Sequence, residues 1–97
     1  MDEPTRTAVL TALAQGDALL EELITQQRAK VLRLAREAVP DITSDDVLNP
    51  HDFPALKAHA TFEYEDGILA GYIAAQMAIR ARIIAPVRFA DDAPPAQ

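Results

Sequence analysis

One stretch of the chain holds an imidazole and three carboxylates within eight residues, from His59 to Asp66. His59, Glu63 and Asp66 are spaced by four and then three residues, so on a continuous helix of 3.6 residues per turn they project from one face. An imidazole with two carboxylates is a ligand set that suits iron, manganese or zinc, and helical bundles build metal sites from such groups. The spacing therefore predicts a divalent metal site at these three residues.

The same residues also fit the solvated or ion-paired end of a packing helix. If the two helices are antiparallel, a residue of the first lies opposite a residue of the second when their two residue numbers sum to about 92. This holds because both helices rise by the same distance per residue. Glu63 then lies level with Lys30, and Asp66 with Arg28. The acidic pair at 21–22 lies level with apolar residues. This register favours ion pairs between helices, and a metal site would have to take its further carboxylates from a partner chain.

A second acidic pattern combines the Glu-x-x-Asp spacing of Glu63 and Asp66 with the pair Glu21 and Glu22. This set resembles the magnesium-binding carboxylates of the all-α nucleotide pyrophosphohydrolases of the MazG type. The resemblance implies Mg²⁺ held through carboxylates and substrate phosphates, with a bound water as the nucleophile. The pattern departs from that family at Thr25, where the family's first motif has a third Glu.

The elements that must position these residues are two long helices in one domain, residues 1–86. Over residues 4–38 no proline interrupts the chain after Pro4, and apolar residues recur at spacings of three, four or seven, which predicts one amphipathic helix. A connector over 39–53 is rich in proline and aspartate. A second helix is expected over 54–84, ended by Pro86. The tail over 87–97 is expected to be mobile.

The second helix is apolar almost all round over its C-terminal half, and such a helix must be surrounded. One partner helix from the same chain cannot surround it. We therefore expect an all-α fold in which a long antiparallel helical hairpin dimerises into a four-helix bundle. The predicted interface consists of Gly67, Ile68, Gly71, Tyr72, Ala75 and Ile79.

The composition limits the classes of partner. Fifteen acids against nine bases give a formal charge of −6, which repels nucleic acids and anionic membrane surfaces. The chain has no cysteine, so it forms no disulfide or thiolate metal site. The longest uncharged stretch, residues 67–79, would rise about 20 Å as a helix, short of the ~30 Å hydrocarbon core of a bilayer. We expect a cytoplasmic protein.

These observations predict a non-enzymatic, acidic helical protein that acts through protein–protein association, as an adaptor, a regulatory subunit or an inhibitor. Its expected partners are further copies of itself, as a homodimer or higher homo-oligomer, and an unidentified protein. No cofactor is expected. The alternative is a metal-dependent hydrolase or a metal-binding four-helix bundle that uses His59, Glu63 and Asp66, with nucleotides as candidate substrates.

Overall fold

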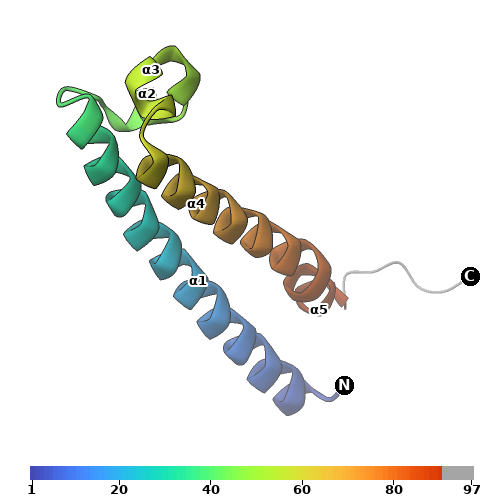
Figure 1. The fold of residues 1–97 in the computed structure, drawn as a ribbon. Coiled ribbons are helices and arrows are strands. Elements are labelled where there is room, and N and C mark those ends of the chain that lie inside the picture. The colour runs from blue at the N-terminus through green and yellow to red at the C-terminus, as the bar shows by residue number, and fades with distance from the viewer. Residues whose placement is uncertain (91–97) are drawn as a thin grey trace, which may run out of the picture.

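The computed structural model describes residues 1–90, and its regular secondary structure over that range is entirely helical, which confirms the all-α class. Helices α1 (Glu3–Ala38) and α4 (Ala60–Ile79) lie side by side and run in opposite directions (Figure 1). In the structure the connector spans residues 39–59, longer than the predicted 39–53, and holds α2 (Ser44–Val47), the 3₁₀ turn η1 (Pro50–Asp52) and α3 (Pro54–Lys57). A π turn, η2 (Arg80–Ile84), and α5 (Ala85–Arg88) follow α4.

Helix α1 has a defined start and a defined end. The carboxylate of Asp2 accepts a hydrogen bond from the Thr5 backbone N–H at 2.8 Å, and Pro4 occupies the first turn, where its missing N–H costs nothing. At the other end Val39 has an extended backbone. It precedes Pro40, and the residue before a proline is disfavoured in the helical region.

The connector closes one end of the helix pair with its own buried residues. The side chain of Thr43 accepts from the backbone N–H of Asp46, and the Asp46 carboxylate accepts from the backbone N–H of Thr43, a reciprocal capping box that fixes α2. Ile42 and Leu56 are almost completely buried and join the core between α1 and α4. The connector is therefore a folded cap on the helix pair.

The second helix does not run unbroken from residue 54 as predicted. It is interrupted at Ala58 and His59, so that α3 and α4 are separate helices. Leu56 and Phe62, one on each side of the break, are both fully buried. Six residues apart on a continuous helix, they would point about 120° away from each other at 100° per residue. The break turns both side chains into the same core.

The predicted stop at Pro86 is also corrected, because the helical path continues through it to Arg88. In a regular helix the ring of Pro86 would clash with the carbonyl of residue 82, four positions earlier. Here the preceding turn is wider: the Ala85 N–H bonds to the Arg80 carbonyl, five residues back. A π turn of this kind accommodates the proline without ending the helix.

The expected mobile tail, 87–97, begins inside α5, and residues 91–97 lie outside the described residues. Helix α5 continues the path of α4 and lies against the start of α1, where the Arg6 guanidinium donates a hydrogen bond to the Arg88 carbonyl at 2.7 Å. The two ends of the described chain are therefore joined directly.

The fold is long and thin. Its principal extents are 57 × 27 × 19 Å and its radius of gyration is 18.8 Å, whereas a compact domain of this length has a radius of about 12 Å. Figure 1 shows α1 and α4 diverging away from the connector. A shape of this kind leaves much of each helix without a neighbour from the same chain.

Candidate functional site

The three residues of the predicted metal site lie in different surroundings. His59 is the N-cap of α4: its Nδ1 accepts from the Phe62 backbone N–H at 3.0 Å, and its Nε2 lies 3.3 Å from Glu37 Oε2. Because the backbone of His59 is extended, the helical spacing that would align it with Glu63 and Asp66 begins only after it. Among residues 1–90, no group of three His, Cys, Asp or Glu side chains is placed to hold a metal ion.

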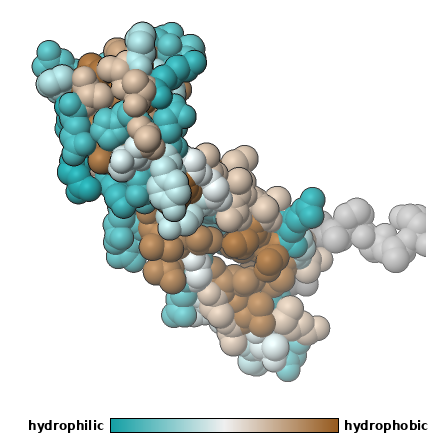
Figure 2. Space-filling model, viewed as in Figure 1, coloured by the Kyte–Doolittle hydropathy of each residue, from teal (hydrophilic) through white to brown (hydrophobic). Residues whose placement is uncertain are grey.

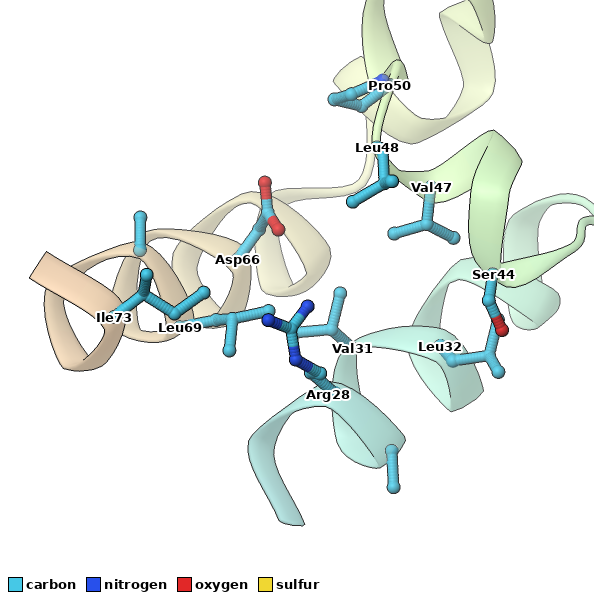
Figure 3. Close-up of a pocket in the computed structure, with 12 residues that line it drawn as sticks. Arg28, Val31, Leu32, Ser44, Val47, Leu48, Pro50, Asp66, Leu69 and Ile73 are labelled. Carbon is cyan, nitrogen blue, oxygen red and sulfur yellow. The ribbon is translucent and has the colours of Figure 1, made fainter. Parts of the chain in front are cut away.

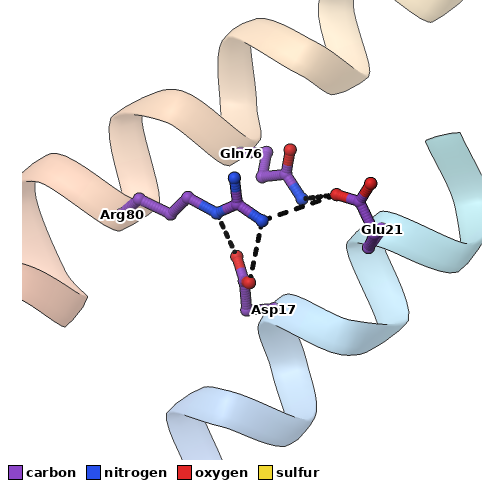
Figure 4. A network of polar contacts seen from close by, with 4 residues as sticks. All are labelled: Asp17, Glu21, Gln76 and Arg80. Carbon is purple, nitrogen blue, oxygen red and sulfur yellow. Dashed lines mark hydrogen bonds and ion pairs between the residues drawn. The ribbon is translucent and has the colours of Figure 1, made fainter.

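The acidic residues on α1 belong to a polar network with α4. Arg80 binds Asp17 with two hydrogen bonds, from Nε to Oδ1 at 2.8 Å and from Nη2 to Oδ2 at 3.0 Å. The Gln76 amide donates to Glu21 Oε2 at 2.7 Å, and Arg80 also reaches that oxygen at 3.4 Å (Figure 4). The hydrogen bonds from Arg80 hold the pKa of Asp17 below its ordinary value. The network occupies the Glu21 carboxylate that the magnesium-site resemblance would require.

A second polar contact lies nearer the connector and is buried. The Gln27 amide donates to both the carbonyl and the Oε2 of Glu65, at 2.9 and 2.7 Å, and Lys30 Nζ lies 2.8 Å from Glu65 Oε1. These bonds, from Lys30 first and Gln27 second, lower the pKa of Glu65. Lys30 therefore pairs with Glu65 instead of the exposed Glu63 that the register placed level with it.

Helix α4 carries all six residues of the predicted interface, and they differ in exposure. The small residues are exposed, and a Cβ added at Gly67 or Gly71 would meet no atom within 4 Å outside the helix's own local backbone. The larger residues are half-buried, and Tyr72 packs against the core. The glycines are therefore not needed for the contact between α1 and α4, since they face open space.

Lys30 and Glu65 show which faces of the two helices lie on the same side of the molecule. Two leucines of α1 precede Lys30 by seven and eleven residues, close to whole helical turns, so they share its face. Four apolar residues of α4 and η2 follow Glu65 by three, seven, fourteen and eighteen residues and share its face in the same way. We call this surface the apolar flank: Leu19, Leu23, Ile68, Tyr72, Ile79 and Ile83.

The apolar flank is open to solvent over much of its area. Leu19 is 58% exposed and Ile83 is 49% exposed. Figure 2 shows that apolar side chains gather on both helices away from the connector, whereas hydrophilic side chains predominate at the connector end. The leucines on α1 were not part of the predicted interface, although their spacing of four residues was a signal that could have identified them.

The opposite side of the helix pair contains a groove of about 350 Å³ between α1, α2 and α4 (Figure 3). Its lining is mostly apolar, with one carboxylate and one guanidinium. The lining residues include Arg28, Leu32, Val47, Leu48, Asp66, Leu69 and Ile73. The groove is thus distinct from the apolar flank, and it contains one residue of the predicted metal site.

Asp66 is half-buried beside this groove, and its side-chain carboxylate forms no hydrogen bond or ion pair with another residue in the described part of the chain. Burial raises the pKa of its carboxyl, and the charge of Glu63 raises it further. Arg28, which the register placed level with Asp66, faces the same groove without reaching the carboxylate. Asp66 is therefore an acidic group without a bonded cation.

The helical run Ala60–Arg88 is long and apolar enough, by length and composition alone, to cross a membrane. Only 17% of its most apolar window is buried within the chain. The sequence estimate of about 20 Å covered residues 67–79, where the helix is uncharged, whereas the helical run continues past Arg80 and Arg82. Most of this apolar helix is therefore left uncovered by the rest of the described chain.

Comparisons of the chain with protein-family models, with curated proteins and with solved structures found no match.

Proposed function

We propose that this protein acts through protein–protein association, and that its first partner is a second copy of itself. In this proposal α1 and α4 form a helical hairpin, and two hairpins pack through their apolar flanks into a four-helix bundle. The observation that carries the proposal is the apolar flank, a surface contributed by both long helices and left open to solvent. Exposed apolar surface that is continuous across two elements is typical of interaction sites.

The charges on α1 favour an aqueous partner over a lipid one. Asp17 and Glu21 are tied to α4 through Arg80 and Gln76, so a membrane span by α4 would carry these groups toward the hydrocarbon. Charged side chains at that depth are costly. A protein surface that covers the apolar flank leaves the charged outer face of α1 in water.

A second copy fits the flank because each chain contributes one apolar stripe from each of its two helices. A two-fold axis through such a surface places four stripes around one core, which is the arrangement of a four-helix bundle. The exposed strip with Gly67 and Gly71 borders the flank and permits a close approach of helix backbones. The role of the dimer is to present its outer, acidic surface to another protein, as an adaptor, regulatory subunit or inhibitor.

Sedimentation equilibrium over a range of protein concentrations tests the proposal. The unaltered chain should associate to a mass of at least two chains, and Leu19→Glu should weaken this association at least about tenfold, because it would bury an unpaired charge. Met77→Glu is the matched control: Met77 is 65% exposed and follows Ile73, a groove residue, by four positions on the opposite side of α4. A monomeric unaltered chain, or equal effects of the two substitutions, would overturn the proposal.

Gly71→Leu tests the edge of the same interface without disturbing the single chain. The space around Gly71 is open, and replacement of a helical glycine favours the helix by roughly 0.5 to 1 kcal/mol. The single chain should therefore fold at least as well, while the bulkier side chain should weaken the dimer. A Gly71→Leu protein of unchanged mass in solution would exclude the glycine strip from the interface.

A further inference from the structure

The groove on the opposite side of the helix pair has the size and lining of a small-molecule site. Its volume of about 350 Å³ lies within the range of roughly 300 to 1,000 Å³ that is common for such sites. Three separate segments build it: one turn of α1, the connector and the middle of α4. A groove formed by three segments is held in place by the folded core beneath it, where Val31 and Leu69 are buried.

One apolar side chain at this groove is left in water. Leu48 is 69% exposed, and Figure 3 shows it with Val47 above the groove, on the side facing Leu69 and Ile73. An apolar ligand between Leu48 and α4 would cover this side chain together with the groove floor. The apolar side chains of the groove therefore favour a ligand that carries an apolar chain or ring.

The charged groups at the groove determine the polar part of the ligand. Asp66 is half-buried and short, so its carboxylate remains at the groove whether or not a ligand is present. Arg28 is exposed and its guanidinium is carried on a long flexible stem, so it can turn into solvent. Neither group is bonded to another described residue. The charge that stays fixed at the groove is therefore the negative charge of Asp66, and a positively charged ligand would complement it.

We propose that this groove binds an amphiphilic cation, a small molecule with an apolar chain or ring between Leu48 and Ile73 and an ammonium group on the Asp66 carboxylate. The ammonium would form a charge-assisted hydrogen bond with Asp66, which lacks such a partner in the chain alone. Burial and the charge of Glu63 already disfavour the ionised carboxylate, so a bound cation would relieve an existing cost. The proposal does not depend on the apolar flank and does not require self-association.

Amide NMR shifts of the full chain test the proposal in titrations with octylammonium and octanoate below their micelle concentrations, and with 1-octanol below its solubility limit. Each of the three probes has eight carbon atoms in an unbranched chain, and their head groups are cationic, anionic and neutral. Octylammonium should shift the amides of groove residues such as Leu32, Leu48 and Leu69, and should bind about tenfold more tightly than octanol. Octanoate should bind more weakly than octanol because Asp66 repels it.

Two pairs of variants separate the parts of the site. Asp66→Asn should remove the preference for the cation, whereas Glu63→Gln, on the exposed neighbouring carboxylate, should keep it. Ala70→Phe should fill the groove and abolish binding of all three probes, whereas Ala74→Phe, at an exposed position of α4 outside the groove lining, should not.

Other outcomes would overturn the proposal. Equal binding of the three probes would show an apolar groove that does not select the charge of its ligand. Tighter binding of octanoate would show that Arg28, and not Asp66, sets the charge preference of the groove. Shifts centred on Leu19 and Ile79 would show adsorption to the apolar flank. An absence of shifts at the groove would show that the site does not bind this class of ligand.

Discussion

The side-chain amide of Gln27 on α1 donates two hydrogen bonds to a single residue of α4, Glu65: one to its backbone carbonyl and one to its carboxylate. Both residues are buried, so the contact replaces hydration that neither group retains. Lys30 adds an ion pair to the other carboxylate oxygen. One residue of α4 is therefore held by two residues of α1, which fixes the register of the two helices.

The first prediction concerns the pH dependence of this contact. The pKa of Glu65 is lowered in the folded chain from its ordinary value of about 4.5, so the folded state binds fewer protons than the unfolded state just below that value. The stability that Glu65 contributes is therefore fully present above about pH 4.5 and is lost as the pH falls through the folded pKa. Glu65→Gln should lower the thermal midpoint at pH 7, and the deficit should shrink in acid. A deficit that is constant from pH 7 to pH 3 would contradict this role.

The second prediction concerns the core beneath the connector. Phe62 is fully buried, and Phe62→Ala should reduce the free energy of unfolding by about 3 to 5 kcal/mol. Tyr64→Ala is the matched control on the same helix: Tyr64 is 69% exposed and the change should be within about 0.5 kcal/mol. Denaturant unfolding of both variants measures the difference. Equal losses would show that Phe62 is not at the centre of the core.

The third prediction separates the capping role of His59 from a metal role. Loss of the bond from the Phe62 N–H to His59 Nδ1 should cost roughly 0.5 to 2 kcal/mol in His59→Ala. His51→Ala, at an exposed histidine of the connector, should change stability little. The stability change caused by each of the two substitutions should be the same with chelator and with added Mg²⁺, Mn²⁺, Fe²⁺ or Zn²⁺. If the thermal midpoint of the unaltered chain rises with one metal, and the double variant His59→Ala, Glu63→Ala shows no such rise, the metal site would instead be established.

The fourth prediction concerns Asp66. Its pKa is raised in the folded chain, so the folded state binds more protons than the unfolded state and stability rises as the pH falls through the folded pKa. Above that pH the ionised carboxylate opposes folding. Asp66→Asn should therefore raise the thermal midpoint at pH 7, and this gain should vanish below the ordinary Asp value of about 3.8. A lower midpoint at pH 7 would mean that the carboxylate has a stabilising partner.

The first long helix could be predicted from the sequence because its signals are local. Asp2 and Pro4 mark its start, and Pro40 follows its end. The break before α4 has no such signal, since neither glycine nor proline stands at Ala58 or His59. The break is decided by the burial of Leu56 and Phe62 in one core, which depends on how α1 and the connector pack around them and not on the pattern of a single segment.

The candidate sites were predictable only in part for the same reason. The register agrees with the contact between Gln27 and Glu65, whose residue numbers sum to 92. It failed at the far end, where Asp17 and Glu21 bond to residues about one turn further along α4. Figure 1 shows the helices diverging there, and the long side chains of Gln76 and Arg80 bridge the separation. The groove could not be predicted, because it depends on the folded position of the connector.

The wider turn at Arg80–Ile84 has a consequence for how this chain can change in length. It stores one residue more than a straight helix would, which rotates everything after Ile84 by about 100° relative to that helix. Removal of one residue there would use up this extra residue and leave the Arg88 carbonyl facing Arg6, but a regular turn would bring the ring of Pro86 against the carbonyl four residues before it. A loss of one residue near residue 82 would therefore keep α5 against the first turns of α1, and Pro86 would be the residue that opposes the loss.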